Sequence, residues 1–332
     1  MKKFTGLLKR SFTGLSVFIV VLAITGLIYQ TAAAESDQRK YPPPGVLVNV
    51  HGYKMHIYCV GEGSPTIVLD HAGGGSSMDW SLIQPKLAEH TRVCAYDRAG
   101  YGWSDYNPAP RTLAEQVDEL HALLSGANEP GPYLLVGHSY GARVDRVFAM
   151  EYLDEVTGMV LMDPGILYDD PRYPAETQSQ MKSDNNMIHA GRWLAPFGLV
   201  RLLQPVMSNP TFDLPENAHL MNASFSARAS YWQSLNDQSA VLSGVFEEEH
   251  RVTSLGELPL LVLISTEPED ALIRSGLRRT LKCLRFPLAA AIALFLERPT
   301  SRWPIAGRMP SSAQMEFWKS WRPLAWRRPR NW

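Results

Sequence analysis

Short apolar runs alternate with amphipathic stretches along this sequence, and that alternation limits the fold more than any other feature. The stretch 112–126 has apolar residues at helical spacing, with Thr112 as its N-cap and Glu115 completing a capping box. The runs between such stretches are mostly apolar, as is typical of strands buried on both faces of a parallel sheet. They span residues 66–70, 92–97, 133–137 and 158–163. This order predicts an α/β fold, with a mostly parallel central sheet and helices on both faces.

Three more runs extend the predicted sheet. Residues 46–50 and 54–60 are strand-like and are joined by a turn, which predicts a hairpin, and 258–265 is the last convincing run. Between about 164 and 257 the alternation stops, and the pattern indicates helices and loops. We therefore expect a helical insertion in the position of a lid. With 332 residues, of which 45% are hydrophobic, the chain is long enough to bury a full core.

The segment Gly-His-Ser-Tyr-Gly, at 137–141, stands where one predicted strand ends and a helix begins. A strand–turn–helix of this kind holds a serine in a tight, exposed elbow. Gly137 and Gly141 flank Ser139, and a side chain at either position would crowd the turn. Ser139 is therefore the candidate nucleophile. The alternative is a glycine-rich turn without chemistry, since the motif alone also occurs by chance.

Two further loops accompany this segment. "HAGGG" at 71–75 follows the predicted strand 66–70, and "DRAGYGWSD" at 97–105 follows the next one. With "GHSYG", these loops make the sequence resemble the α/β-hydrolase family in motif order and spacing. The resemblance runs from about Val46 to Ile264. It implies the α/β-hydrolase fold for a domain at 46–270, with the lid insertion inside it.

The resemblance also implies a role for each matching residue. Ser139 would be the nucleophile, and the backbone N–H groups of Tyr140 and Gly73 would form the oxyanion hole. The acid would be Asp163, at the end of the strand 158–163, or else Asp270, after the last strand. The implied reaction is hydrolysis of a small ester or apolar substrate through an acyl-enzyme on Ser139. We expect no cofactor, no metal and no nucleic acid as partners.

The base is where the sequence departs from the family. The resemblance implies a catalytic histidine after the last strand, but no histidine follows His250. Residues 271–332 contain 13 Lys and Arg against 2 Asp and Glu, and no further strand is evident. This tail is either a basic extension or the product of a shifted reading frame, and the missing histidine favours the shifted frame. A catalytically inactive protein or binding module is therefore the alternative to an active hydrolase.

The N-terminus predicts membrane targeting. Lys2, Lys3, Lys9 and Arg10 precede the apolar stretch 12–29, which at 18 residues is close to the minimum for a membrane span. The basic flank predicts a cytoplasmic N-terminus, with the remainder of the chain outside.

Three readings remain for this segment: an uncleaved anchor in 1–34, a signal peptide cleaved after Ala34, and a buried soluble helix. The anchor is favoured, and the polar, proline-rich residues 35–45 would then form a linker.

The three cysteines offer no disulfide framework and no metal-ligand spacing. Cys59 and Cys94 lie in strand-like runs. In an exported chain they could form a disulfide, and two buried free thiols are the alternative.

Overall fold

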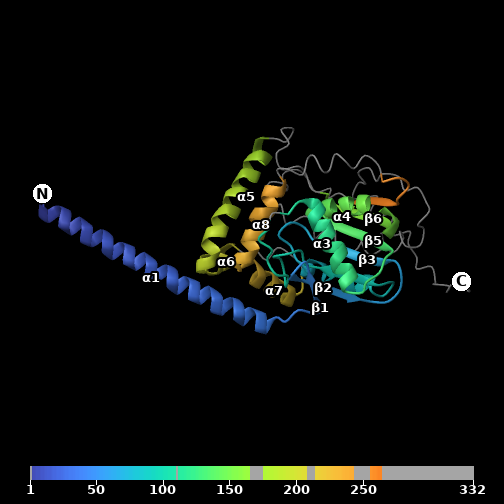
Figure 1. Ribbon diagram of the computed structural model, residues 1–332, viewed down its shortest axis with the longest axis horizontal. Coiled ribbons are helices and arrows are strands. Elements are labelled where there is room, and N and C mark those ends of the chain that lie inside the picture. Colours follow the sequence, from blue (N-terminus) through green and yellow to red (C-terminus); the bar gives the residue numbers. More distant parts are fainter. Residues whose placement is uncertain (1, 110, 165–174, 208–213, 243–254, 264–332) are drawn as a thin grey trace, which may run out of the picture.

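A computed structural model describes residues 2–109, 111–164, 175–207, 214–242 and 255–263 of the chain. Within these residues, seven strands form one sheet in the order β1-β2-β4-β3-β5-β6-β7 (Figure 1). The strands are β1 Val46–Val50, β2 Tyr53–Val60, β3 Thr66–Asp70, β4 Val93–Tyr96, β5 Tyr133–His138, β6 Val156–Met162 and β7 Leu260–Leu263. β2 pairs antiparallel with β1 and β4, and the other pairs are parallel. The predicted α/β fold with a mostly parallel sheet is confirmed.

The helices fall into three groups along the chain. One long helix, α1, spans Lys2–Lys40. Those between the strands are η1 Ser77–Trp80, α2 Gln84–Leu87, α3 Leu113–Gly126, α4 Tyr140–Glu151 and η2 Leu153–Glu155. The described helices of the lid are α5 Ala175–Leu194, η3 Ala195–Phe197, α6 Leu199–Met207, α7 Glu216–Ser226 and α8 Ala229–Leu242.

Each face of the sheet has its own apolar core. On one face, Val68 and Leu135 pack with side chains of α3 and α4. On the other face, Ile67 and Val136 pack with side chains of η1 and α2. Because successive strand residues point to opposite faces, an almost wholly apolar strand fills both cores. This two-sided burial explains why these strands show no polar alternation.

The local helix signals hold in detail for α3. Thr112 is its N-cap, and the capping box with Glu115 is formed in both directions. The helical spacing of Trp80, Ile83 and Leu87 also predicts a helix that begins near Met78, and the structure divides it into η1 and α2. Pro85, at the start of α2, lacks the N–H that a continuous helix would need and so separates the two.

The N-terminal helix continues further than the sequence suggested. α1 runs to Lys40, so that residues 35–40 of the expected linker are helical and only the proline-rich residues 41–45 lie outside helix and strand. An ion pair between Glu35 and Arg39, one turn apart, lies on this part of the helix. The helix contains an 18-residue window that is apolar enough to cross a membrane.

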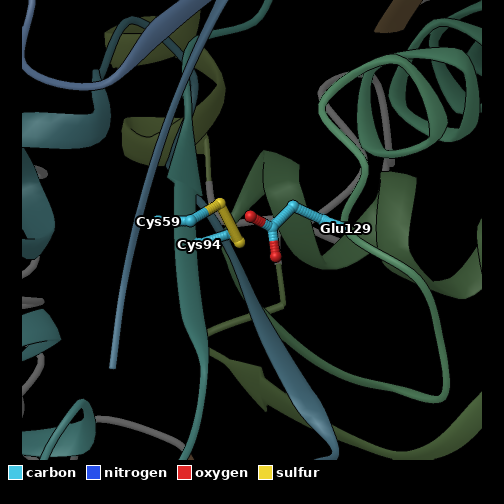
Figure 2. Close-up of side chains that lie close together, drawn as sticks. All are labelled: Cys59, Cys94 and Glu129. Atoms are coloured by element: carbon cyan, nitrogen blue, oxygen red, sulfur yellow. A yellow bond between two sulfur atoms is a disulfide. The ribbon is translucent and has the colours of Figure 1, made fainter. Parts of the chain in front are cut away.

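A disulfide joins Cys59 to Cys94 across the antiparallel pair β2 and β4 (Figure 2). The two residues are direct partners in the register, with Cα atoms 4.0 Å apart. Of the two readings that the sequence left open, the structure has the disulfide. The carboxylate of Glu129 lies beside the disulfide in Figure 2. This carboxylate forms an ion pair with Arg92.

Candidate active site

Ser139 occupies a strained turn between β5 and α4. Its backbone has φ 51° and ψ −107°, in a region that residues with a side chain rarely adopt. The N–H of Ser139 donates to the carbonyl oxygen of Met162 at 2.9 Å, which holds the turn against the neighbouring strand β6. The side chain does not cap the helix that it precedes. The hydroxyl therefore stands at the N-terminus of α4 without a structural task there.

The two flanking glycines are required by close backbone contacts. A Cβ on Gly137 would lie 2.6 Å from the backbone nitrogen of Ala142. A Cβ on Gly141 would lie 2.5 Å from the carbonyl oxygen of Asp70. Neither backbone group can move without shifting the turn or the end of β3. The structure thus gives the elbow that the segment 137–141 predicted.

Asp163 follows directly on the last residue of β6, at the same edge of the sheet as Ser139. The last pair of the parallel β5–β6 ladder is His138 with Met162. Asp163 is half-buried, has φ 38°, and donates its N–H to the carbonyl oxygen of Leu263 at 2.8 Å. The structure therefore places the first candidate acid on the strand next to the nucleophile. The other candidate, Asp270, lies outside the described residues.

The loop at 71–75 is held by the buried guanidinium of Arg98. This group donates to the carbonyl oxygens of His71 and Ala72, both at 2.7 Å. In a trans peptide the C=O and the following N–H point in opposite directions. Since the Ala72 carbonyl faces Arg98, the N–H of Gly73 faces away from it. The loop thus presents a backbone donor on the side opposite the arginine.

The loop at 97–105 is folded around the fully buried carboxylate of Asp97. That carboxylate accepts hydrogen bonds from the backbone N–H groups of Ser77 and Trp103, and from Nδ1 of His56. Burial opposes the charge of Asp97, but the hydrogen bond and charge of His56 outweigh it and lower the pKa of the carboxyl. Asp97 therefore acts as an ionised anchor for three segments around the site.

Two acidic side chains and Arg98 are buried together beneath the elbow. Asp70 pairs with Arg98 and accepts a hydrogen bond from Tyr96 at 2.6 Å. Neither carboxylate oxygen of Asp145 has a hydrogen-bond partner among the described residues. Burial, followed by the nearby charge of Asp70, raises the pKa of Asp145 well above its usual range. Burial also raises the pKa of Asp70, while the charge of Arg98 and the hydrogen bond from Tyr96 act in the opposite direction. Of the two carboxyls, Asp70 is thus the one whose charged form a direct ion pair stabilises.

Helix α8 of the lid covers the loop at 71–75, called the oxyanion loop below after the role that the family resemblance implies for Gly73. Tyr231 donates its hydroxyl to the carbonyl oxygen of Gly74 at 3.0 Å. The side-chain amide of Gln238 stands against Gly73, where a Cβ would lie 2.4 Å from its nitrogen, and its oxygen accepts from Tyr101 at 2.9 Å. Our sequence reasoning did not identify these side chains, because they come from the insertion and no spacing motif ties them to residues 71–75.

Two histidines lie close to the elbow in sequence or in space, and both are held neutral. His71 is fully buried in the oxyanion loop, and burial, followed by the charge of Arg98, lowers its pKa well below the usual value. The same two causes lower the pKa of His138 to about 3. His71 is hydrogen-bonded to Ala72 and Arg98, which agrees with a structural role.

The other histidines that follow Ser139 in the sequence are His189, His219 and His250. Of the histidines in the insertion, His189 is exposed and His219 is half-buried. His250 lies outside the described residues. Among the residues that the structure describes, no histidine side chain is hydrogen-bonded to Ser139.

The fold and the elbow together define an α/β protein of the hydrolase type. The chain belongs to the alpha/beta hydrolase family, whose family model matches residues 67–330. The match includes the residues after 263 that the structure does not describe. The family resemblance drawn from the three sequence motifs is thereby confirmed.

Solved structures show the same fold at low sequence identity. A putative epoxide hydrolase from Pseudomonas aeruginosa superimposes with a TM-score of 0.61 at 15% identity, covering 76% of this chain and 95% of that one. A thermophilic esterase from Thermogutta terrifontis superimposes with a TM-score of 0.56 at 19% identity, covering 77% and 99%. At these identities the likeness establishes the fold and not the reaction.

Curated relatives match shorter parts of the chain. YqjL of Bacillus subtilis is 39% identical over 106 residues, which are 32% of this chain and 42% of YqjL. A vacuolar membrane protein of Saccharomyces cerevisiae is 33% identical over 129 residues, 33% of this chain and 20% of that protein. The chain thus spans well under two thirds of the length of these relatives.

Proposed function

We propose that this protein is a serine hydrolase that cleaves carboxylic esters through an acyl-enzyme on Ser139. The observation that carries the proposal is the strained backbone of Ser139, at φ 51°, directly before α4 and beside the end of β6. Backbone strain of this kind persists where the surrounding structure enforces it, and it concentrates at functional sites. In this strained conformation the Ser139 hydroxyl does not cap α4, as the hydroxyl of a serine before a helix ordinarily does.

The chemistry follows from the groups around the elbow. The Ser139 hydroxyl oxygen attacks the ester carbonyl carbon while its proton passes to a base, and the carbonyl oxygen becomes an oxyanion. The N–H groups of Tyr140 and Gly73 stabilise that oxyanion; one such donor contributes about 3 kcal/mol to lowering the barrier. The alkoxy group leaves as the alcohol after taking the proton. Water then attacks the acyl carbon and releases the acid, which restores Ser139.

Asp163 is the proposed acid of the triad. Its position on the strand next to Ser139 supports this role, and Asp270, the alternative acid, lies outside the described residues. A carboxylate there would hold the base in the correct tautomer and stabilise its imidazolium form.

The base is the reason for a second candidate function. No histidine follows His250 in the sequence, and the two near the elbow have pKa values well below neutrality. A protein with this fold but without a base would bind an ester-like ligand without turning it over. A shifted reading frame past about residue 270 would account for both the missing histidine and the basic tail, and sequencing the gene across codons 265–332 tests it.

The similarity to epoxide hydrolases is not a reason to propose epoxide hydrolysis for this chain. The family resemblance places an aspartate nucleophile at the elbow of such enzymes, and this chain has Ser139. The lid around α6 has exposed apolar side chains, which supports an apolar ester as substrate.

We further propose that α1 anchors the protein in a membrane, with the hydrolase domain on the extracytoplasmic side. Its apolar side chains between Phe12 and Tyr29 are exposed on the helix surface, as a lipid environment requires. The Cys59–Cys94 disulfide supports the topology, because such bonds persist in oxidising compartments.

Intact-protein mass spectrometry after incubation with p-nitrophenyl butyrate tests the reaction. The hydrolase account expects a butyryl adduct on Ser139 that is absent in Ser139→Ala. A folded protein that binds the ester and releases no p-nitrophenol favours the binding module.

A further inference from the structure

We propose that the outer face of the lid is a second membrane-contact surface. It lies in the membrane–water boundary, next to the end of α1 that leads into the hydrolase domain. This surface, called the lid face below, consists of the exposed apolar side chains of Trp193, Phe197, Leu199, Leu202 and Leu203. The proposal rests on the membrane anchor proposed above. It adds that a part of the chain far from the anchor in sequence also enters the bilayer.

On α6 the lid face is a stripe of leucines, and another side of the same helix is packed against the lid core. Leu199, Leu202 and Leu203 stand at helical spacing on one side of α6, with exposed fractions of 42%, 61% and 48%. Val200, on the same helix, is buried in a small core that includes Trp232 of α8. The helix therefore already has an inner apolar side, and its outer leucines are not needed for packing within the described residues. Contiguous exposed apolar surface of this kind marks an interaction site.

An aromatic and a basic side chain border the stripe. Trp193, at the end of α5, is 72% exposed. The guanidinium of the neighbouring Arg192 lies 5.8 Å from its ring centroid. Tryptophan is enriched at membrane–water boundaries, where its ring sits among the lipid headgroups. Arginine beside it can place its charge toward water and lipid phosphates while its stem stays on apolar surface.

The lid face adjoins the membrane helix. α1 contacts η3, and Figure 1 shows α6 next to α1. The contact is close, because a Cβ on Gly26 would lie 2.4 Å from the carbonyl oxygen of Phe197. On the other side of the junction, Gly198 has φ +73° and a Cβ there would lie 2.8 Å from the ring of Tyr29. The two glycines allow the backbones to approach at the level of the last turn of the apolar stretch.

Polar contacts fix this junction just beyond the apolar stretch. Gln30 is buried, donates to the carbonyl oxygen of Ala227 at 2.7 Å and accepts from Arg201 at 3.2 Å. Arg201 also pairs with Asp37 at 2.8 Å. The lid is therefore clamped to α1 by three interactions, two of which involve Arg201. A rotation of α1 away from the lid would break all of them.

The height of the lid along α1 follows from helix geometry. Gly26 lies three residues before Tyr29, where the apolar stretch ends, and a helix rises about 1.5 Å per residue. The contact with Phe197 is therefore about 4–5 Å inside the end of the apolar stretch. If that stretch lies in the hydrocarbon core, η3 reaches its edge. Amphipathic segments that lie on a membrane bury their apolar side about 5–10 Å into this boundary.

This arrangement specifies where the substrate comes from. α8 packs with one side against the lid core through Trp232, while Tyr231 contacts Gly74 of the oxyanion loop. Helices α6 and α8, each about 10–12 Å in diameter, thus lie between the lid face and the loop that would hold the oxyanion. The matching substrate class is an ester that partitions into the lipid bilayer, with its apolar part in the membrane and its carbonyl near the surface.

Site-directed spin labelling of the full chain in phosphatidylcholine vesicles tests the lid face. In a Cys283→Ser background, single cysteines replace Leu202 in the lid face, Val20 in α1, and Leu153. Leu153 is the matched control, because it is an exposed leucine (43%) on η2, outside the lid. Collisions with oxygen, which concentrates in lipid, are compared with collisions with a water-soluble nickel chelate.

The expected result is that the labels at positions 202 and 20 favour oxygen and the label at 153 favours the nickel chelate. A label at 202 that behaves like the one at 153, while the label at 20 is in lipid, overturns the lid face and leaves the anchor standing. A label at 202 shielded from both reagents indicates a protein partner and also overturns the proposal. A label at 20 that is open to the chelate overturns the anchor, and the lid face with it.

Discussion

Ser139 and Asp163 continue the same pair of neighbouring strands, one step beyond the ladder pair of His138 and Met162. Both have positive φ, 51° and 38°, although neither is a glycine. The N–H of Ser139 bonds to β6 and the N–H of Asp163 bonds to β7, so that each turn is tied to the next strand. The sheet thus holds a serine and an aspartate at the ends of two neighbouring strands, in backbone conformations that their residue types disfavour.

This strain predicts an unusual stability series at position 139. Ser139→Gly should unfold at higher urea concentration than Ser139→Ala, by about 1–2 kcal/mol in free energy of unfolding, because glycine adopts positive φ without a steric cost. Glycine is also preferred to alanine at an ordinary N-cap, so the same two substitutions at Thr112, the unstrained N-cap of α3, are the control and should differ by less. Equal stabilities for the two variants would contradict the strained elbow.

The buried pair of Arg98 and Asp70 predicts a strongly non-additive double-mutant cycle. Arg98→Met should cost about 3–5 kcal/mol, because it leaves a carboxylate buried without its partner. Adding Asp70→Asn should recover a large part of this loss. The control is Arg92→Met, whose partly exposed ion pair with Glu129 should contribute about 1 kcal/mol or less. Additive effects of the Arg98 and Asp70 changes would show that the two do not interact as described.

The depressed pKa of His138 predicts a loss of stability in acid. Its folded pKa of about 3 lies below the usual 6.5, so the unfolded chain binds the extra proton first. The contribution is complete above pH 6.5 and is lost as the pH falls toward 3. The difference in free energy of unfolding between the natural chain and His138→Gln should therefore change between pH 6.5 and 4, by up to about 1.4 kcal/mol per pH unit. A constant difference would mean that His138 titrates normally.

The disulfide predicts a specific alkylation pattern. Without reduction, iodoacetamide should leave Cys59 and Cys94 unmodified, as peptide mass spectrometry can show. Replacing both paired cysteines by serine should lower the free energy of unfolding by about 2–4 kcal/mol, chiefly because the unfolded chain gains freedom. Alkylation of all three cysteines in folded, unreduced protein would refute the bond.

The sequence was sufficient for those features that depend on local patterns. The apolar runs identified the strands, because burial on both sheet faces leaves no room for polar residues, and the glycines around Ser139 identified the elbow. The capping box of Thr112 and Glu115 located a helix start to the residue. Each of these signals is confined to a few residues that are neighbours in the sequence.

The contacts between distant segments were beyond such reasoning. The clamp of Arg98 on the loop at 71–75, and the cover of that loop by Tyr231 and Gln238, join residues up to 165 positions apart, without a common spacing. The length of α1 was underestimated because the contact of Asp37 with Arg201 of the lid is also long-range. Tertiary packing decides such features, and a single sequence does not display it.

Labelling of the full-length protein with a fluorophosphonate probe tests the central claim most directly, because the probe forms a covalent bond with an activated serine in an oxyanion hole. Peptide mass spectrometry should find the phosphonyl group on Ser139, and Ser139→Ala, folded to the same extent by circular dichroism, should remain unlabelled. The serine-nucleophile account would be contradicted if the folded natural chain acquired no label, or acquired it equally in the Ser139→Ala variant.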